Sequence, residues 1–424
     1  MWHAQKDDFA PRLGIAWNPR QNLVIRAGGG IFYDLGYSQI ANVASAFPNS
    51  QQKLILPTCS QGVCSPLPFP LTADQAAPPP FTTSPPVSLL VVVDPNHVLP
   101  RTYEWNAAVE QSLSSADVLT MTYVGAGGRK LMRRDVNFAP NSEFTGEFDV
   151  LSNHGTSSYN ALQAEYRHRV SHGLQTLLSY TWGHSIDDVS GDGNFFNVPL
   201  NATTPGSERA SSDYDIRQTF SGAVSYDIPG PNKGVLKQVF GNWSTDTIIY
   251  ARSSIPVNVV TGQNPFPHTV LFGASSVQRP NVVPSVPFYL YGGQYPGGKI
   301  INANAFCVPS PQCKPFVAGQ VQGDLGRNAL RGFGATQWDI TLRRQFRFTE
   351  RFSLQFRGDF FNILNHPNFG NPTSYLTAHS PTPFGYASQM LNNYLGSGGQ
   401  LGGLNPLYQI GGPRSIQLAL KLQF

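Results

Sequence analysis

The chain has 424 residues, of which 13% are charged and 12% are aromatic, and it contains 41 glycines and 35 prolines. The charged share is about half that of an ordinary soluble domain, and a formal net charge of +4 with no Lys/Arg-rich run gives no reason to expect a nucleic-acid partner. No run of about eighteen apolar residues occurs, which excludes transmembrane helices. A transmembrane β-barrel and a large secreted β-protein both remain.

Residues 1–8 contain neither the basic region nor the apolar stretch of a secretory signal peptide. Residues 9–17 already alternate like a strand within a larger sheet. We therefore expect this chain to be the C-terminal part of a longer exported protein.

Further segments alternate apolar and polar residues as β-strands do. Most have the roughly nine to eleven residues that a tilted strand needs to cross a bilayer, whereas soluble strands average about five or six. Single-chain bacterial barrels have an even number of strands, so an odd count again indicates a partial barrel. The predicted strands are 9–17, 23–33, 101–113, 117–125, 158–170, 174–185, 217–227, 243–253, 336–348, 352–361 and 415–424.

The connections between these strands alternate strictly between short and long. Transmembrane barrels have short periplasmic turns on one rim and long extracellular loops on the other, whereas a soluble sandwich or propeller has no reason to keep that parity. The connections therefore favour an antiparallel transmembrane barrel. The short ones are 18–22, 114–116, 171–173, 228–242 and 349–351, and the long ones are 34–100, 126–157, 186–216, 254–335 and 362–414.

The last strand carries an apolar stripe that ends on the terminal aromatic residue. Ile416, Leu418, Leu420, Leu422 and Phe424 alternate with small or polar residues, which fits lipid on one face and water on the other. The alternative is the closing strand of a soluble sheet. In the membrane interpretation, Leu420, Leu422 and Phe424 form the signal that the barrel assembly machinery recognises.

The two strands before it show the same two faces. We expect an inward polar ladder that contacts a plug or, alternatively, lines a solute path. Arg344 is an exception, because it falls on the apolar face with Trp338 and Leu342, and either a bulge or snorkelling toward the rim would explain it. The inward residues are Arg343, Gln345, Arg347, Arg357 and Asp359.

The cysteines form two local pairs in proline-rich segments, Cys59 with Cys64 and Cys307 with Cys313. Because no histidine lies at ligand spacing, loop disulfides in an oxidising compartment are favoured over zinc.

We find no catalytic constellation, and we expect neither an enzyme nor a cofactor. The histidines His154, His168, His172 and His184 do not form a helix-spaced metal pair. Gly28-Gly29-Gly30 lies inside a predicted strand, so it is no phosphate-binding loop. The acidic residues Asp187, Asp188, Asp192, Asp213 and Asp215 could bind Ca²⁺, but their spacing matches no calcium loop, and contacts at the barrel rim or solvation are favoured.

Several segments resemble the Oar-like β-barrel domain of TonB-dependent transporters, of the acidobacterial type. The matches cover roughly residues 100–424, in the order of the family, and together they are specific. They are 158–162 (SYNAL), 171–175 (SHGLQ), 180–188 (YTWGHSIDD), 212–217 (SDYDIR), 326–332 (GRNALRG) and 360–370 (FFNILNHPNFG).

The resemblance implies a Gram-negative outer-membrane protein with a signal peptide, a regulatory-like domain, a plug and a barrel of about 22 strands. Residues 1–424 would be the C-terminal barrel part, and the TonB complex would act through the N-terminal region. The implied function is active uptake of a bulky nutrient such as a siderophore, glycan or peptide. The alternative is a surface adhesion or structural protein that acts through its long loops on an unknown extracellular ligand.

Overall fold

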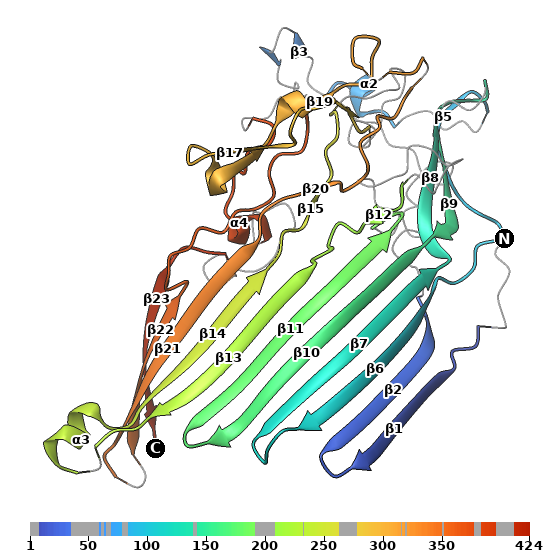
Figure 1. Cartoon of the computed structure of the whole chain (residues 1–424). Coiled ribbons are helices and arrows are strands. Elements are labelled where there is room, and N and C mark those ends of the chain that lie inside the picture. Colours follow the sequence, from blue (N-terminus) through green and yellow to red (C-terminus); the bar gives the residue numbers. More distant parts are fainter. Residues whose placement is uncertain are drawn as a thin grey trace.

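The computed structural model describes residues 8–34, 59–60, 63–64, 69–78, 84–138, 142–190, 208–231, 233–262, 278–314, 316–318, 320–349, 352–376, 383–395 and 411–424. Its main element is one curved antiparallel sheet in which long strands pair in chain order (Figure 1). The long strands are β1 (Arg12–Arg20), β2 (Leu23–Tyr33), β6 (Arg101–Ser112), β7 (Asp117–Arg129), β10 (Ser157–Ser171), β11 (Leu174–Asp187), β13 (Gln218–Ile228), β14 (Trp243–Arg252), β21 (Ala335–Arg347), β22 (Ser353–Phe361) and β23 (Ser415–Gln423).

These strands confirm the all-β, partial-barrel prediction, and each predicted strand is present. The first begins and ends three residues later than predicted, and its pairing with β2 continues past Trp17 to Arg20 through a register shift. Within the described part of the chain, β1 and β23 stand at the two ends of the strand order, and each pairs on one side only. Closing this sheet into a barrel requires further strands.

The short connections lie together at one end of the sheet (Figure 1). Between β10 and β11 the turn is His172-Gly173, with φ values of 51° and 79°. Two consecutive positive φ angles give the primed turn whose twist matches that of the flanking strands.

The connection 228–242 is not a plain turn. It contains the helix α3 (Gly234–Phe240), which the strand pattern did not predict. Of the described helices, none has the length and apolar character needed to cross a membrane.

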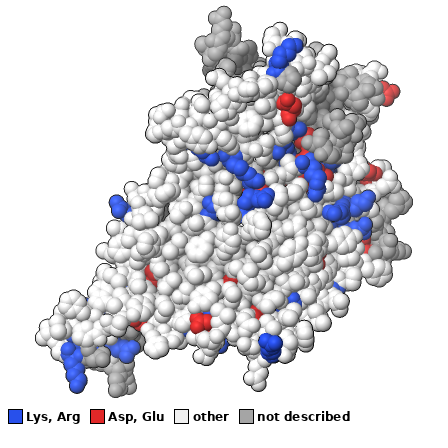
Figure 2. Space-filling model, in the orientation of Figure 1, with Lys and Arg blue, Asp and Glu red and all other residues white. Residues whose placement is uncertain are grey.

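The two faces of the sheet differ in chemistry along its whole width. Across β22 and β23, Phe356 lies opposite Leu420 on one face, and Arg357 lies opposite Ala419 on the other. Residues that oppose each other in an antiparallel pair point to the same side, so the apolar and polar sets extend across the sheet. Figure 2 shows one side of the molecule, on which charged residues are sparse along the strands and gather where the strands meet the loops.

The polar face is the hollow one. A cavity of about 510 Å³ lies over β2, β6, β7, β10 and β11, and its lining includes Arg26, Glu110, Thr120, Gln163 and Arg167. Arg357, Asp359 and Lys421 belong to this face by register. The membrane interpretation requires this arrangement, with polar residues inside and apolar residues outside.

The loop ends of the strands carry a separate layer of small sheets (Figure 1). Its apolar core comprises Val257, Val259, Ile301, Ala305, Phe306, Leu325 and Leu330. This layer, unlike the apolar face of the main sheet, buries apolar side chains against one another. Its elements are β3 (Cys59–Ser60), β4 (Val63–Cys64), β5 (Val87–Val93), β8 (Leu131–Phe138), β9 (Phe144–Gly155), β15 (Pro256–Val257), β16 (Asn281–Val282), β17 (Tyr289–Tyr291), β18 (Lys299–Ile301), β19 (Phe306–Cys307), β20 (Leu330–Arg331), α2 (Ala73–Ala76), α4 (Leu391–Leu395) and the 3₁₀ turns Pro296–Gly298 and Ala303–Ala305. The short strand β12 (Ala210–Ser211) pairs with the end of β11 and so belongs to the main sheet.

Candidate functional site at the loop-bearing rim and on the polar face

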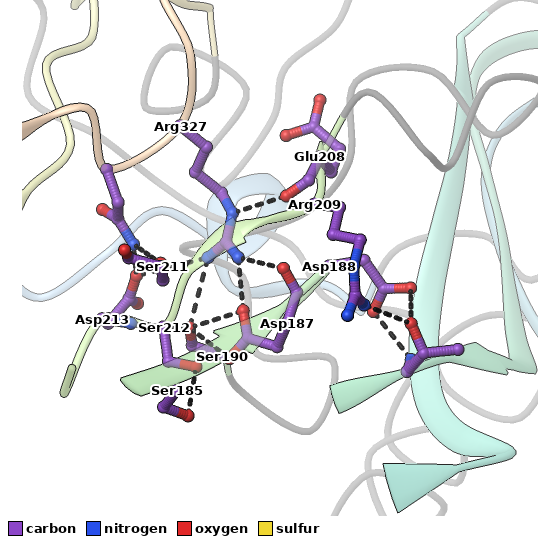
Figure 3. Close-up of polar contacts among 12 residues, drawn as sticks. Ser185, Asp187, Asp188, Ser190, Glu208, Arg209, Ser211, Ser212, Asp213 and Arg327 are labelled. Atoms are coloured by element: carbon purple, nitrogen blue, oxygen red, sulfur yellow. Dashed lines mark hydrogen bonds and ion pairs between the residues drawn. The ribbon is translucent and has the colours of Figure 1, made fainter. Parts of the chain in front are cut away.

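Three segments distant in sequence converge at the loop end of β11. They are the end of β11 itself, residues 208–215 around β12, and residues 326–332 around β20. Figure 3 shows the polar side chains of this rim network pointing toward one another. These segments include three of the stretches that carried the family resemblance.

Arg327 is the centre of the rim network. Its Nη2 donates to the carbonyl of Asp187 at 2.8 Å and also to the Asp187 carboxylate. Its Nε donates to the Glu208 carbonyl at 2.9 Å, and Nη1 donates to Ser190 Oγ at 3.2 Å. The side chains of Arg327 and Asp187 are 3% and 1% exposed. A charge buried this deeply is tolerated because several partners compensate it.

Asn328 and Arg331 extend the network to the next acidic pair. Asn328 Nδ2 donates to Asp213 Oδ1 at 2.6 Å and to the Ser211 carbonyl at 2.8 Å. Arg331 donates from Nη2 to Asp215 Oδ2 at 2.6 Å and from Nη1 to the Asp215 carbonyl at 2.8 Å. Two arginines and one asparagine of a single heptapeptide therefore hold one neighbouring loop.

The Asp215 carboxyl is buried at the base of this contact. Burial alone raises its pKa, but hydrogen bonds from Arg331, the Ser185 amide and His184 outweigh burial and hold the pKa below its ordinary value of 3.8. Asp215 is therefore an anion over the physiological pH range, and it supplies the countercharge for Arg331.

A further ion pair, between Arg279 and Glu208, joins the loop around β12 to the segment that precedes residues 326–332. Arg279 donates to both carboxylate oxygens of Glu208 at 2.8 and 3.1 Å, and its Nε donates to the Leu325 carbonyl at 2.8 Å. Bidentate arginine–carboxylate pairs are among the stronger polar contacts in proteins. Glu208 thus binds Arg279 through its side chain and Arg327 through its backbone carbonyl.

The β8–β9 hairpin carries a separate buried cluster. Arg133 donates to Asp135 at 2.6 Å, and Arg134 is paired with Asp149. Asp188 accepts from the Thr156 amide at 2.9 Å and lies 3.9 Å from Arg133. This cluster connects the hairpin to the end of β11.

Three of the acidic residues that could have bound Ca²⁺ are part of the rim network. Asp187, Asp213 and Asp215 contact arginine or asparagine side chains at the rim, which is the role favoured over calcium. Asp192 lies outside the described residues. In the described part of the chain, no group of three or more His, Cys, Asp or Glu side chains is placed to hold a metal ion.

The predicted inward residues share the polar face by register, and three of them, Arg343, Arg357 and Asp359, take part in ion pairs. Arg343 Nε lies 2.7 Å from Asp246 Oδ2, and Arg357 donates to Asp359 at 2.9 Å. Arg343 lies directly opposite Arg357 across β21 and β22, and the two carboxylates offset this like-charge contact. The remaining two, Gln345 and Arg347, lie opposite Gln355 and Ser353.

Arg344 is on the apolar face, as its position in β21 predicted, and the pairing on both sides runs through it without a register shift, so a bulge does not explain its position. Its guanidinium stacks 5.3 Å from the ring centroid of Trp243 and 4.3 Å from that of Phe346. Trp243 lies directly opposite Arg344 across β14 and β21, so cation–π contacts hold the charge on this face.

The predicted assembly signal lies at the exposed end of the last strand. Leu420 and Leu422 are exposed on the apolar face, and Phe424 is 91% exposed.

One of the two predicted cysteine pairs is a disulfide. Cys307 and Cys313 form it in the loop layer. Cys59 and Cys64 oppose each other in the β3–β4 pair, and their side chains lie outside the described residues.

The sequence pointed to some of the residues of the rim network but not to the contacts between them. The stretch 326–332 was noted for its family resemblance, and the acidic residues for their clustering, but nothing in the pattern joined them. No pattern in the sequence singled out Glu208, Arg279, Arg133 or Arg134. Glu208 and Arg279 are 71 positions apart, and the Asp149 partner of Arg134 lies on another strand. Arg133 has Asp135 two residues away on the same strand, but strand alternation alone does not show that this pair is buried.

A family model described as an outer membrane beta barrel domain matches residues 1–397. No curated protein matches the chain. The outer membrane transporter YddB from Escherichia coli has a similar structure, with a TM-score of 0.50 at 10% identity over 98% of this chain and 40% of that chain. BauA, the ferric preacinetobactin receptor from Acinetobacter baumannii, has a TM-score of 0.44 at 10% identity over 98% of this chain and 36% of that chain. The chain therefore spans about two fifths of these structures (40% and 36%). The likeness to YddB, at 10% identity, concerns the fold.

Proposed function

The chain belongs to the outer membrane beta barrel domain family, and from this premise we propose that it forms part of the wall of a TonB-dependent receptor of the Oar-like, acidobacterial type. The receptor imports a bulky nutrient, such as a siderophore, glycan or peptide, across the Gram-negative outer membrane. The 10% identity to the transporter YddB supports the wall architecture and says nothing of the nutrient.

The observation that carries this proposal is the division of the sheet into two faces. The apolar face suits lipid, while the opposite face is hollow and lined by charged and hydroxyl side chains. Large barrels of this kind enclose a polar lumen that is filled by a plug. A soluble sheet of this width would instead pack its apolar face against another layer.

The polar ladder fits contact with a plug. Asp246 and Asp359 already neutralise Arg343 and Arg357 in part, so the ladder presents fixed dipoles and limited net charge to whatever fills the lumen. Gln345 and Arg347 extend this ladder toward the short-turn end. The plug and the segment that engages the TonB complex would come from parts of the receptor outside residues 1–424.

Assembly requires two further partners. The edges β1 and β23 need neighbouring strands, because unpaired backbone groups are not tolerated in lipid. The barrel assembly machinery would recognise the last strand through Leu420, Leu422 and Phe424.

A second candidate is a surface adhesion or structural protein. The observation that favours it is the loop layer, which has its own apolar core and is fixed to the rim by buried ion pairs. A rigid outer surface of this kind suits contact with another surface as well as capture of a nutrient.

The experiment that separates the two uses a strain in which the full-length gene is deleted and then complemented. We expect the deletion to abolish growth on one class among ferric siderophores, oligosaccharides and peptides offered as the limiting nutrient. Growth should return with the gene but not in a strain that lacks TonB. Normal growth on all three classes, with loss of attachment to surfaces whether or not TonB is present, would favour adhesion.

A further inference from the structure

The helix α3 exposes an apolar surface at the short-turn end of the sheet. Val235, Leu236, Val239 and Phe240 are 74%, 61%, 48% and 59% exposed. At about 100° per residue these four positions fall on one side of the helix, and Lys237 lies beside that side. Figure 1 shows α3 projecting from the ends of β13 and β14.

Trp243 attaches α3 to the apolar face of the sheet. Its indole Nε1 donates to the Val239 carbonyl at 3.2 Å. Trp243 opposes Arg344 in the register, Arg344 opposes Phe356, and Phe356 opposes Leu420. Trp243 therefore joins α3 to the apolar face of the wall.

Arg344 adds a positive charge at the same place. Its guanidinium stacks on Trp243 and Phe346, and its Nε is buried without a hydrogen-bond partner in the described part of the chain. Arg344 is three residues from Arg347, the end of β21, which is about 10 Å of strand. A long arginine side chain reaches a headgroup from that depth.

Lys233 and Lys237 stand at the same end, on and beside α3. Figure 2 shows basic atoms over the region of this helix. The combination of an apolar helix side, a tryptophan and three cations is the pattern of a segment that lies in the headgroup region of a membrane.

We propose that α3, Trp243, Arg344 and Phe346 form an interfacial anchor for anionic phospholipid in the periplasmic leaflet of the outer membrane. The apolar side of α3 lies at the acyl boundary, and the guanidinium of Arg344 and the ammonium of Lys237 bind lipid phosphates. Lipid is the occupant because the surface is continuous with the lipid-facing wall and its cations match phosphate. The inference rests on the membrane location and does not depend on which nutrient is carried.

The test uses the full-length protein in nanodiscs of phosphatidylethanolamine and phosphatidylglycerol. A fluorophore on Val239→Cys is compared with one on Ser115→Cys, in another short turn at the same end. We expect several-fold weaker iodide quenching at position 239 than at 115, together with quenching by spin-labelled phospholipid at 239 alone. Equal iodide quenching at the two positions would overturn the proposal. Protection from iodide at 239 without quenching by spin-labelled phospholipid would show that something other than lipid covers the helix and would also overturn it.

The second arm tests the lipid phosphate. Native mass spectrometry counts phosphatidylglycerol retained by the wild type, by Arg344→Gln and by Lys421→Gln, in which the lost cation lies on the polar face. Arg344→Gln should retain several-fold less lipid, and Lys421→Gln should match the wild type. Equal retention by all three proteins, each folded by its heat-modified mobility, would overturn the assignment of Arg344.

Discussion

Arg327 and Asp187 are 140 positions apart, and the guanidinium of Arg327 donates to both the carboxylate and the carbonyl of Asp187. This contact fixes the connection before β21 to the end of β11, and both side chains are buried. The loop layer is therefore bound to the rim by charges that have lost their water. Its order should depend on keeping both partners.

Replacing Arg327 with glutamine should loosen the loop layer while leaving the wall intact. Breaking a buried ion pair from one side costs about 3–5 kcal/mol, because the remaining charge stays buried without compensation. Amide hydrogen exchange of the full-length protein in detergent should show lost protection at residues 208–215 and 326–332. Protection along β10 and β11 should not change.

Two comparisons isolate this effect. Arg209→Gln removes an exposed arginine of the same rim that donates to Thr156 and Ser158, and it should cost about 0.5 kcal/mol or less. The double variant Arg327→Met with Asp187→Leu should recover much of the loss, because neither charge remains buried. A double variant as poorly protected as the single one would contradict the ion-pair account.

Acidification should protonate Asp215 and so weaken its contact with Arg331, which loosens residues 208–215 and 326–332. Its pKa is lower in the folded loop than the ordinary value of 3.8, so the unfolded loop binds more protons in the interval between the two values. The stabilisation is complete above that ordinary value and is lost as pH falls through the lower, folded pKa. Exchange protection at residues 326–332 should therefore fall with acidification below about pH 4. Asp215→Asn should flatten this part of the pH dependence, and an unchanged profile would assign it to other carboxylates.

Loss of the terminal aromatic residue should reduce assembly and leave ligand affinity unchanged. Phe424 is 91% exposed, at the rim opposite the loops, so its removal deletes little packing within the chain. In the full-length protein, Phe424→Ser should lower the amount of heat-modifiable barrel in outer-membrane fractions. If the two strains contain equal folded amounts under normal expression, the residue is ordinary strand packing.

Residues 1–424 expressed alone should aggregate. The edges β1 and β23 leave rows of backbone donors and acceptors unpaired, and exposed flat edges are sites of association. Size-exclusion chromatography in detergent should give polydisperse material. A monodisperse, heat-resistant species would mean that the two edges close on each other.

The wall was predictable from the sequence because each of its signals is local. Alternation over nine or more residues and the parity of the connections depend only on neighbouring residues, and they gave all the long strands. The later end of β1, at Arg20, follows a register shift after Trp17 that alternation cannot detect. Helix α3 was missed because it has only seven residues, too few for a helical period to stand out.

The rim network was not predictable, because its partners meet only after the strands have paired. Arg327 and Asp187 belong to different loops, and nothing near either residue specifies the other. Arg344 shows the same limit on a smaller scale. Its place on the apolar face was evident from alternation, but its stabilisation by Trp243 depends on the register between β14 and β21.

The most direct test of this account is whether the two faces of the last strand meet lipid and water in alternation. Spin labels at Leu418, Ala419, Leu420 and Lys421 of the full-length protein in bilayers would report access to oxygen and to a water-soluble nickel complex. The account predicts high oxygen and low nickel access at 418 and 420, and the reverse at 419 and 421. Uniform access along the strand, or the opposite alternation, would contradict the assignment of this chain as a membrane wall.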